Sequence, residues 1–576
     1  MKKFKRLISL LLGACVFFCA TNLIGCNKKT GYDENRSQLF IKYYNGGVGR
    51  VWIDELIKGF EQEYASVSFE KGKQGVQVVM DPEKSVPTVS TIKGNYNQIY
   101  ITVNVNYSEF VAGGAMMDIT DVVTGNALTG KDNPESVTIE SKMPEDRKNT
   151  YNLGTDANPS YYALPFFESS MNLNYNVSVF EAKKLYFAEG KTAEGWSDVD
   201  LKDKTKVQEL FIASLTEPRS AGPDGNPATA YDNGLPATYD DFQALITMME
   251  GSGVIPFIWN GTATSYLTCL ANEMWANNEG KENYMATFNF RGNAENLVQM
   301  TGSAGKEAIS LNSDGSAVML DDGNGTALTP ETSYLIHAQK GKYDALRLVE
   351  MIAKSDYYDN SFSENYLSAQ DIFIHAETKK ETENKPIGMI IEGTWWNNEA
   401  KASYASEQDR YNYNFGILPL PKADASQIGT PNTKISERES LMFISKYCDE
   451  YAIPIAKAFM KYINSDKAMN IFTQKTDMLR ALNYELTQDT LKTITNYGKS
   501  VYQISREVGT QWVDWMPQSV EAQKNKGLLD YLSWGYRTTL GSNPFELVVN
   551  NKLTAKDIFD SSYNFIKGSW AVKSES

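Results

Sequence analysis

The stretch that decides the fold is IGMIIEGTWWNNE, residues 387–399. Its apolar run lies between glycines, which is typical of a strand covered on both faces. Gly393 then marks a turn, and Trp395 and Trp396 fall in the predicted first turn of a helix. Ligands of open α/β sheets bind beyond the carboxyl ends of the strands. We therefore expect indole contacts with a ligand that has apolar C–H faces ringed by hydroxyls, such as a sugar.

The alternative interpretation places both tryptophans in the core. Neighbouring positions on a helix or strand point in different directions. We therefore expect at most one of Trp395 and Trp396 to be a core residue.

The composition limits the classes of function. The chain has 576 residues, a net charge of −15 and 12% aromatic residues, so it lacks the basic character of a nucleic-acid-binding protein. Two histidines, His337 and His375, leave little for zinc binding or general-base catalysis. Asp321, Asp322 and Asn324 lack the spacing of a calcium loop. The sequence predicts no metal and no cofactor.

The amino terminus predicts export. Residues 1–25 have a basic start followed by an apolar run, as in a secretory signal. Leu23-Ile24-Gly25-Cys26 resembles a bacterial lipobox, which implies cleavage before Cys26 and acylation of its thiol, for example by palmitate. Residues 26–37 then form a polar tether to the extracytoplasmic face of the cell membrane. The alternatives are an ordinary signal with a chance cysteine, or an uncleaved anchor.

Two further cysteines, Cys269 and Cys448, belong to the body of the chain. A disulfide framework is not implied by this number. We expect two buried free thiols.

Residues 38–125 alternate between strand and helix, which predicts a parallel α/β sheet. Strands are expected at residues 38–44, 76–80 and 98–105, with a helix at 52–64. The polar or aromatic side chains at the strand exits are candidate ligand contacts, namely Tyr44, Asn45, Asn104 and Asn106.

Other candidates lie further along the chain. Glu168, between apolar blocks, is expected either to accept hydrogen bonds from sugar hydroxyls or to cap a turn. Trp259 ends a predicted strand at residues 254–259 and is expected to be either a core residue or a ligand contact, and Asn260 and Tyr266 lie beyond it. Residues 480–484 are expected to form a chain crossing. The remaining carboxyl-terminal part is predicted to be mostly helical, with Trp512 and Trp515 as core residues or ligand contacts.

The chain has no G-x-S-x-G motif, and residues 46–49 (GGVG) lack the further residues of a phosphate-binding or dinucleotide-binding loop. A glycosidase needs only two suitably spaced carboxylates. Glycoside hydrolysis therefore stays open as an alternative.

Several segments together resemble the family 1 extracellular solute-binding proteins of carbohydrate ABC importers, the family of maltose-binding protein. The matching segments include ALP at 163–165 with NYN at 174–176, GTWW at 393–396 and LPLP at 418–421. They occur in the family's order over most of residues 38–485.

The resemblance implies a two-lobed α/β fold of the periplasmic-binding-protein type II, with a mainly parallel sheet in each lobe and a largely helical carboxyl-terminal part. Lobe 1 would hold residues 38–165 and 440–482, and lobe 2 residues 167–438 and 483–570. Trp395 would stack on the sugar, and Glu168 would lie near a hydroxyl-binding carboxylate. Asn104 and Asn106 stand where the family usually has aromatic and charged residues.

The resemblance further implies a monomeric binding protein, not an enzyme, that delivers a sugar or oligosaccharide to an ABC permease. Polar insertions at residues 131–159, 190–236 and 311–330 lengthen the chain. The alternatives are a surface glycoside hydrolase and a binding protein of the same fold for a peptide or another non-sugar solute.

Overall fold

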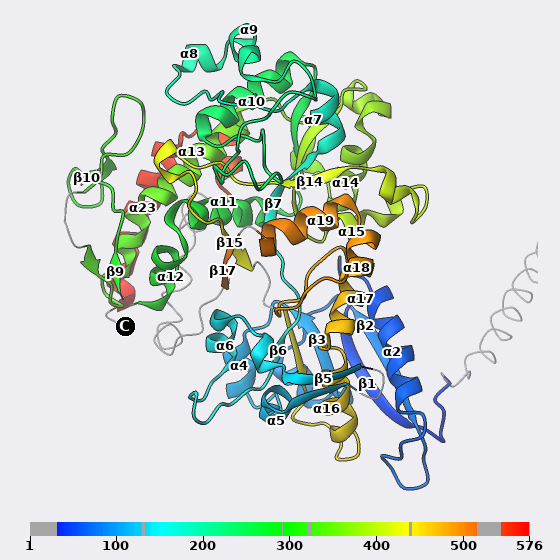
Figure 1. The fold of residues 1–576 in the computed structure, drawn as a ribbon. Coiled ribbons are helices and arrows are strands. Elements are labelled where there is room, and N and C mark those ends of the chain that lie inside the picture. Colours follow the sequence, from blue (N-terminus) through cyan, green and yellow to red (C-terminus); the bar gives the residue numbers. More distant parts are fainter. Residues whose placement is uncertain are drawn as a thin grey trace, which may run out of the picture.

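The computed structural model describes residues 31–129, 133–290, 292–320, 325–436, 440–507, 509–514 and 543–574. These residues form two lobes, each built around a central sheet (Figure 1). Among the described helices, none combines the length and hydrophobicity needed to cross a membrane. Residues 1–30, with the predicted signal and Cys26, lie outside the described part.

Lobe 1, the lower lobe of Figure 1, contains a five-stranded sheet in the order β2-β1-β3-β16-β6. Strands β2, β1 and β3 run parallel, whereas β16 is antiparallel to both β3 and β6. Helix α2 buries Trp52, Leu56 and Phe60 at helical spacing. The strands are β1 (Ser37–Tyr44), β2 (Val76–Glu83), β3 (Ile99–Val103), β6 (Leu164–Pro165) and β16 (Ser440–Ile444), and the helix is α2 (Val51–Glu63).

Lobe 2 contains a four-stranded sheet in the order β14-β7-β13-β8. Strand β13 is buried along its whole length and runs parallel to β8 but antiparallel to β7. The two-lobed α/β class is thus confirmed, but both sheets are mixed because strands return from the other lobe. The strands are β7 (Met171–Asn176), β8 (Ile255–Trp259), β13 (Ile387–Gly393) and β14 (Phe415–Leu418).

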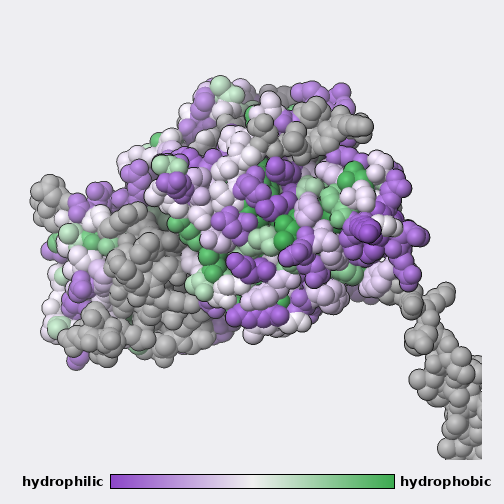
Figure 2. Space-filling view, turned by 90° about the horizontal axis from the view of Figure 1, so that it is seen from below, coloured by the Kyte–Doolittle hydropathy of each residue, from purple (hydrophilic) through white to green (hydrophobic). Residues whose placement is uncertain are grey.

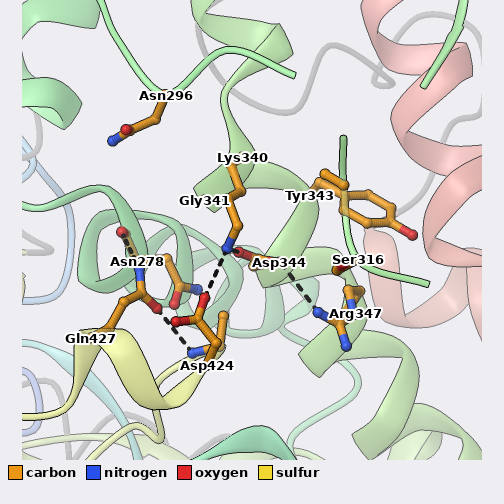
Figure 3. Close-up of polar contacts among 12 residues, drawn as sticks. Asn278, Asn296, Ser316, Lys340, Gly341, Tyr343, Asp344, Arg347, Asp424 and Gln427 are labelled. Carbon is orange, nitrogen blue, oxygen red and sulfur yellow. Dashed lines mark hydrogen bonds and ion pairs between the residues drawn. The ribbon is translucent and has the colours of Figure 1, made fainter. Parts of the chain in front are cut away.

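Helices surround the lobe 2 sheet, and a polar contact joins one of them to the loop after β14. Lys340, at the start of α13, binds the carboxylates of Asp344 and Asp424 at 2.6 and 3.3 Å (Figure 3). Asp424 follows β14, so this network ties the helical layer to the sheet. The helices are α10 (Tyr239–Gly251), α11 (Thr264–Glu279), α13 (Lys340–Lys354), α14 (Tyr366–His375), α15 (Trp396–Glu399), α19 (Asn496–Tyr502), α22 (Pro544–Asn551) and α23 (Ala555–Ser574).

Shorter elements complete both lobes. In and beside lobe 1 they are α3 (Val89–Lys93), α4 (Tyr107–Ala112), α5 (Thr120–Thr124), β4 (Asn126–Thr129), β5 (Asn133–Thr138), α6 (Glu145–Tyr151), α16 (Ile453–Tyr462), α17 (Asp466–Thr476) and α18 (Gln488–Thr493). In lobe 2 they are α7 (Val177–Lys183), α8 (Asp198–Leu201), α9 (Lys204–Val207), α12 (Lys281–Asn289), β9 (Asn293–Ala294), β10 (Met300–Thr301), β11 (Ala308–Ile309), β12 (Thr326–Ala327), β15 (Thr433–Ser436) and β17 (Gln511–Asp514).

The chain crosses between the lobes beside a buried arginine, Arg480. Its guanidinium donates to the carbonyl oxygens of Phe166 and Ile463 at 2.5 and 3.0 Å, and to Oδ1 of Asn464 at 2.7 Å. It forms no ion pair with a described residue, and burial lowers its pKa to about 10. Three acceptors from two segments thus converge on one side chain. The predicted crossing at residues 480–484 lies here.

The two cysteines of the body are free thiols, as expected, but both are half-buried rather than buried. Cys269 lies on α11 in lobe 2, and Cys448 follows β16 in lobe 1.

The face at the lobe 1 end carries hydrophilic side chains with small hydrophobic areas between them (Figure 2).

We predict that Arg480→Met lowers the free energy of unfolding by about 3 kcal/mol, because three buried acceptors lose a charged donor. Chemical denaturation measures this change. Arg36→Met, which alters a partly exposed arginine on lobe 1, is the control and is expected to cost less than about 1 kcal/mol. Equal stability of the two variants would contradict the role of Arg480.

Candidate functional site

An inner pocket of about 150 Å³ lies between the lobes. Lobe 1 contributes loop residues after β1 and the first residue after β2, and lobe 2 contributes the starts of three helices. Phe167, at the crossing, lies beside them. The lining comprises Tyr44, Gly46, Gly47, Val48, Lys84, Phe167, Tyr266, Tyr366, Trp395 and Glu399.

Trp395 occupies the turn between β13 and α15 and lines this pocket. Its side chain packs edge-on against Tyr266, with ring centroids 5.8 Å apart. Gly393 makes room for the indole, because a Cβ atom at that position would overlap the six-membered ring of Trp395. A Cβ at Gly47, across the pocket, would lie 2.7 Å from the indole Cδ1. The indole of Trp395 can therefore lie between the lobes because Gly393 and Gly47, on either side of it, have no side chain.

Trp396, the next residue, is a core residue of lobe 2. It has no exposed surface and packs edge-on against Phe373, Phe415 and Tyr497, with centroids 5.1–5.7 Å apart. The two tryptophans therefore point in different directions, one to the pocket and one to the core. Trp396 is thus not placed to contact a ligand.

Helix α15 also fastens the lobes together. Nδ2 of Asn398 donates to the carbonyl oxygens of Gly47 and Val48, at 2.6 and 2.9 Å. At a separate point between the lobes, Lys281 on α12 pairs with Asp146 on α6. These contacts join the two lobes beside the inner pocket.

The strand-exit candidates of lobe 1 divide into two groups. Tyr44 lines the inner pocket, and its neighbour Asn45 uses its backbone N–H to bond the carbonyl of Glu83 at 2.8 Å. Asn104 is exposed and left-handed, with φ of 56°. Asn106 caps α4 through the N–H of Glu109. Asn45, Asn104 and Asn106 do not line the pocket.

Glu168 is buried at the crossing, where Arg506 binds both carboxylate oxygens at 2.9 and 3.0 Å. The structure therefore gives this carboxylate a cationic partner within the chain. It lies next to Phe167, which lines the pocket, but is not itself among the lining residues.

The remaining candidates lie away from the inner pocket. Trp259 is fully buried against Tyr357, Phe362 and Phe545. Oδ1 of Asn260 accepts from Thr262 and from the N–H of Ala263 at the start of α11. Trp512 lies on strand β17, which pairs with β15, not on the predicted helix. Trp515 and the loop residues Asp321, Asp322 and Asn324 lie outside the described residues.

Three polar side chains of the lining, Lys84, Tyr366 and Glu399, were not among the predicted site residues. Lys84 directly follows β2, so the strand-exit rule applied to that strand would have found it. Glu399 lies within the quoted stretch, four residues after Trp395. Tyr366 begins α14 and carries no local signal, since only the tertiary fold brings it to the pocket.

The lining suits binding by stacking and hydrogen bonding. Three tyrosine rings and the indole of Trp395 surround the pocket. Lys84 from lobe 1 and Glu399 from lobe 2 are its charged groups. Oε2 of Glu399 accepts from Gln370 at 3.1 Å. Among the described residues, no group of three or more acidic, histidine or cysteine side chains is arranged to hold a metal.

Comparisons with known proteins show the fold. No family model matches the chain, and no curated protein matches its sequence. A chitin oligosaccharide binding protein has a TM-score of 0.51 at 12% identity, covering 93% of this chain and 99% of its own. A protein solved in a study of xylan utilization by Caldanaerobius polysaccharolyticus has a TM-score of 0.51 at 10% identity, with coverages of 91% and 98%. The likeness confirms the two-lobed type II fold.

We predict that Asn398→Asp opens the lobes, because a carboxylate would repel the two carbonyl oxygens that the amide now binds. Small-angle X-ray scattering would show a larger radius of gyration than the wild type, for which about 25 Å is expected if compact. Asn365→Asp is the matched control, since Asn365 caps α14 and aspartate caps equally well. An unchanged radius in Asn398→Asp would contradict the fastening role of Asn398.

Proposed function

We propose that this protein is a solute-binding protein that captures a sugar or oligosaccharide between its lobes. The observation that carries the proposal is the inner pocket, where Trp395, Tyr266, Tyr366 and Tyr44 enclose a space that both lobes line. Aromatic faces cover the apolar side of a sugar, while polar groups fix its hydroxyls. The fold shared with a chitin oligosaccharide binding protein supports this class of ligand.

Binding would act through closure of the lobes. A ligand that touches both walls of the pocket stabilises the closed state by its differential affinity for that state. The contacts of Asn398 with the loop of lobe 1 would add to this preference. Trp395 and Glu399 would then meet the ligand from lobe 2, and Tyr44 and Lys84 from lobe 1.

The rest of the proposal concerns location and delivery. Cys26 would carry a lipid on the extracytoplasmic face of a bacterial membrane, after removal of residues 1–25. The closed, loaded monomer would then deliver the sugar to an ABC permease. Lobe boundaries at 38–165 with 440–482, and 167–438 with 483–570, stay predictions that limited proteolysis can check. Mass spectrometry of the membrane fraction tests the acylation of Cys26.

We predict that Trp395→Ala weakens binding of the best glycan in a panel at least tenfold, about 1.4 kcal/mol, because the stacking surface is lost. Isothermal titration calorimetry on the mature protein measures the affinity. Tyr447→Ala, which removes an exposed ring on lobe 1, is the control and should bind as the wild type does. Unchanged affinity in Trp395→Ala would remove this indole from the site.

The stabilities of Trp396→Ala and Trp395→Ala test which of the two indoles belongs to the core. Loss of the Trp396 indole is expected to lower the free energy of unfolding by about 3–5 kcal/mol, with a smaller loss in Trp395→Ala. Denaturation of both variants measures the difference. The reverse order would mean that the assignment of the two rings to core and pocket is wrong.

Two competing functions have separate tests. A surface glycoside hydrolase would release new reducing ends from the same glycans, whereas a binding protein releases none. A binding protein for a peptide or another non-sugar solute would be stabilised by peptides and not by sugars in a thermal-shift competition.

A further inference from the structure

The inner pocket continues into an outer groove of about 350 Å³, which it meets at Gly46–Val48, Lys84, Tyr366 and Glu399. The groove runs past the start of α2 in lobe 1 and past α14 and α15 in lobe 2. The groove is lined by four basic side chains and one carboxylate, that of Glu399. The basic side chains are Arg50, Lys84, Lys401 and Lys475. This local excess of positive charge contrasts with the net charge of −15 for the whole chain.

Two of these cations are already neutralised. Arg50 pairs with Asp54 at 2.7 Å, and Lys475 pairs with Glu55 at 3.0 Å. These contacts lie along α2 and belong to lobe 1. They leave Lys84 and Lys401 as the two cations of the groove that have no ion-pair partner among the described residues.

Lys84 and Lys401 form no ion pair with any described residue. Lys84 is exposed, whereas Lys401 is half-buried and its ammonium group donates to the carbonyl oxygen of Lys475 at 3.3 Å. Burial lowers the pKa of Lys401, because a neutral carbonyl compensates only part of the lost hydration. Glu407 and Asp477 attract this ammonium group without forming an ion pair with it. A half-buried cation of this kind at the edge of a binding pocket is suited to an anionic group on the ligand.

We propose that the glycan carries an anionic group, a carboxylate or a sulfate, which binds Lys84 and Lys401 in the outer groove. This inference rests on the proposed function. The sugar ring would lie in the inner pocket against Trp395, with Glu399 accepting from its hydroxyls. The anion would contact Lys84 from lobe 1 and Lys401 from lobe 2, so it would also favour closure.

Three trisaccharides that differ in charge test the proposal, namely galactotriose, trigalacturonate and sulfated galactotriose. Titration calorimetry on the mature wild-type protein should show at least tenfold tighter binding of one acidic form than of the neutral form. The acidic trisaccharide that binds more tightly identifies the anionic group of the ligand as a carboxylate or a sulfate. This preference should shrink between 50 and 300 mM salt, since the ammonium of Lys84 is exposed to screening, with a Debye length of roughly 10 Å near 0.1 M.

Variants locate the preference. Lys401→Met should reduce binding of the preferred acidic form several-fold and leave binding of galactotriose unchanged. Lys84→Met should weaken binding of the acidic form more than binding of galactotriose, because Lys84 also lines the inner pocket. Lys191→Met, at an exposed lysine of the 190–236 insertion, is the matched control and should keep the wild-type preference.

The outcomes separate the two proposals. If galactotriose binds as tightly as both acidic forms, the inference is overturned while the proposed function stands. The inference is also overturned if an acidic form is preferred but both lysine variants keep that preference. If neither the glycan panel of the Trp395 experiment nor any of the three trisaccharides binds, the proposed function fails, and the inference fails with it.

Discussion

One buried guanidinium, that of Arg480, holds the region where the chain passes between the lobes. It binds carbonyl groups from the end of lobe 1 and from the α16–α17 turn, and it lies 5.3–5.9 Å from the ring centroids of Trp52, Phe166 and Phe472. Its own carbonyl accepts from Arg506, which in turn binds Glu168. Interior charges of this kind are stable only when their hydrogen-bonding capacity is met. The crossing segments are therefore fixed to one another, and movement is left to the lobes on either side.

The pocket depends on this fixed crossing because its two walls come from different lobes. Trp395 reaches the pocket from a turn that immediately follows a fully buried strand, so the indole is held by the core of lobe 2. The loop of lobe 1 that faces it is shaped by Gly46 and Gly47. Small residues on one wall and a rigid ring on the other allow close approach without strain in either lobe.

Local patterns predicted most of the strands, the helix α2 and the different directions of Trp395 and Trp396, because strand burial and side-chain alternation act within a few residues. Contact of Trp395 with a ligand stays a prediction. Local patterns also identified Tyr44 through its place at a strand end. They failed where a side chain is used for local structure, as when Asn106 and Asn260 satisfy backbone N–H groups. They failed again for Glu168, whose partner Arg506 is 338 residues away in sequence. Strand β17 was missed because it forms only through pairing with β15, which is also distant in the sequence.

The two free thiols have a practical consequence that follows from their positions. Cys269 belongs to a helix of lobe 2, and Cys448 follows the returning strand of lobe 1. Burial and the neighbouring Asp449 raise the pKa of Cys448 to about 12, so this sulfur stays protonated and reacts slowly with alkylating reagents at neutral pH. Each lobe therefore carries one native sulfur, but the one on lobe 1 is protected from thiolate-dependent labelling at neutral pH, so a distance measurement between two dyes across the hinge needs a more reactive position on that lobe.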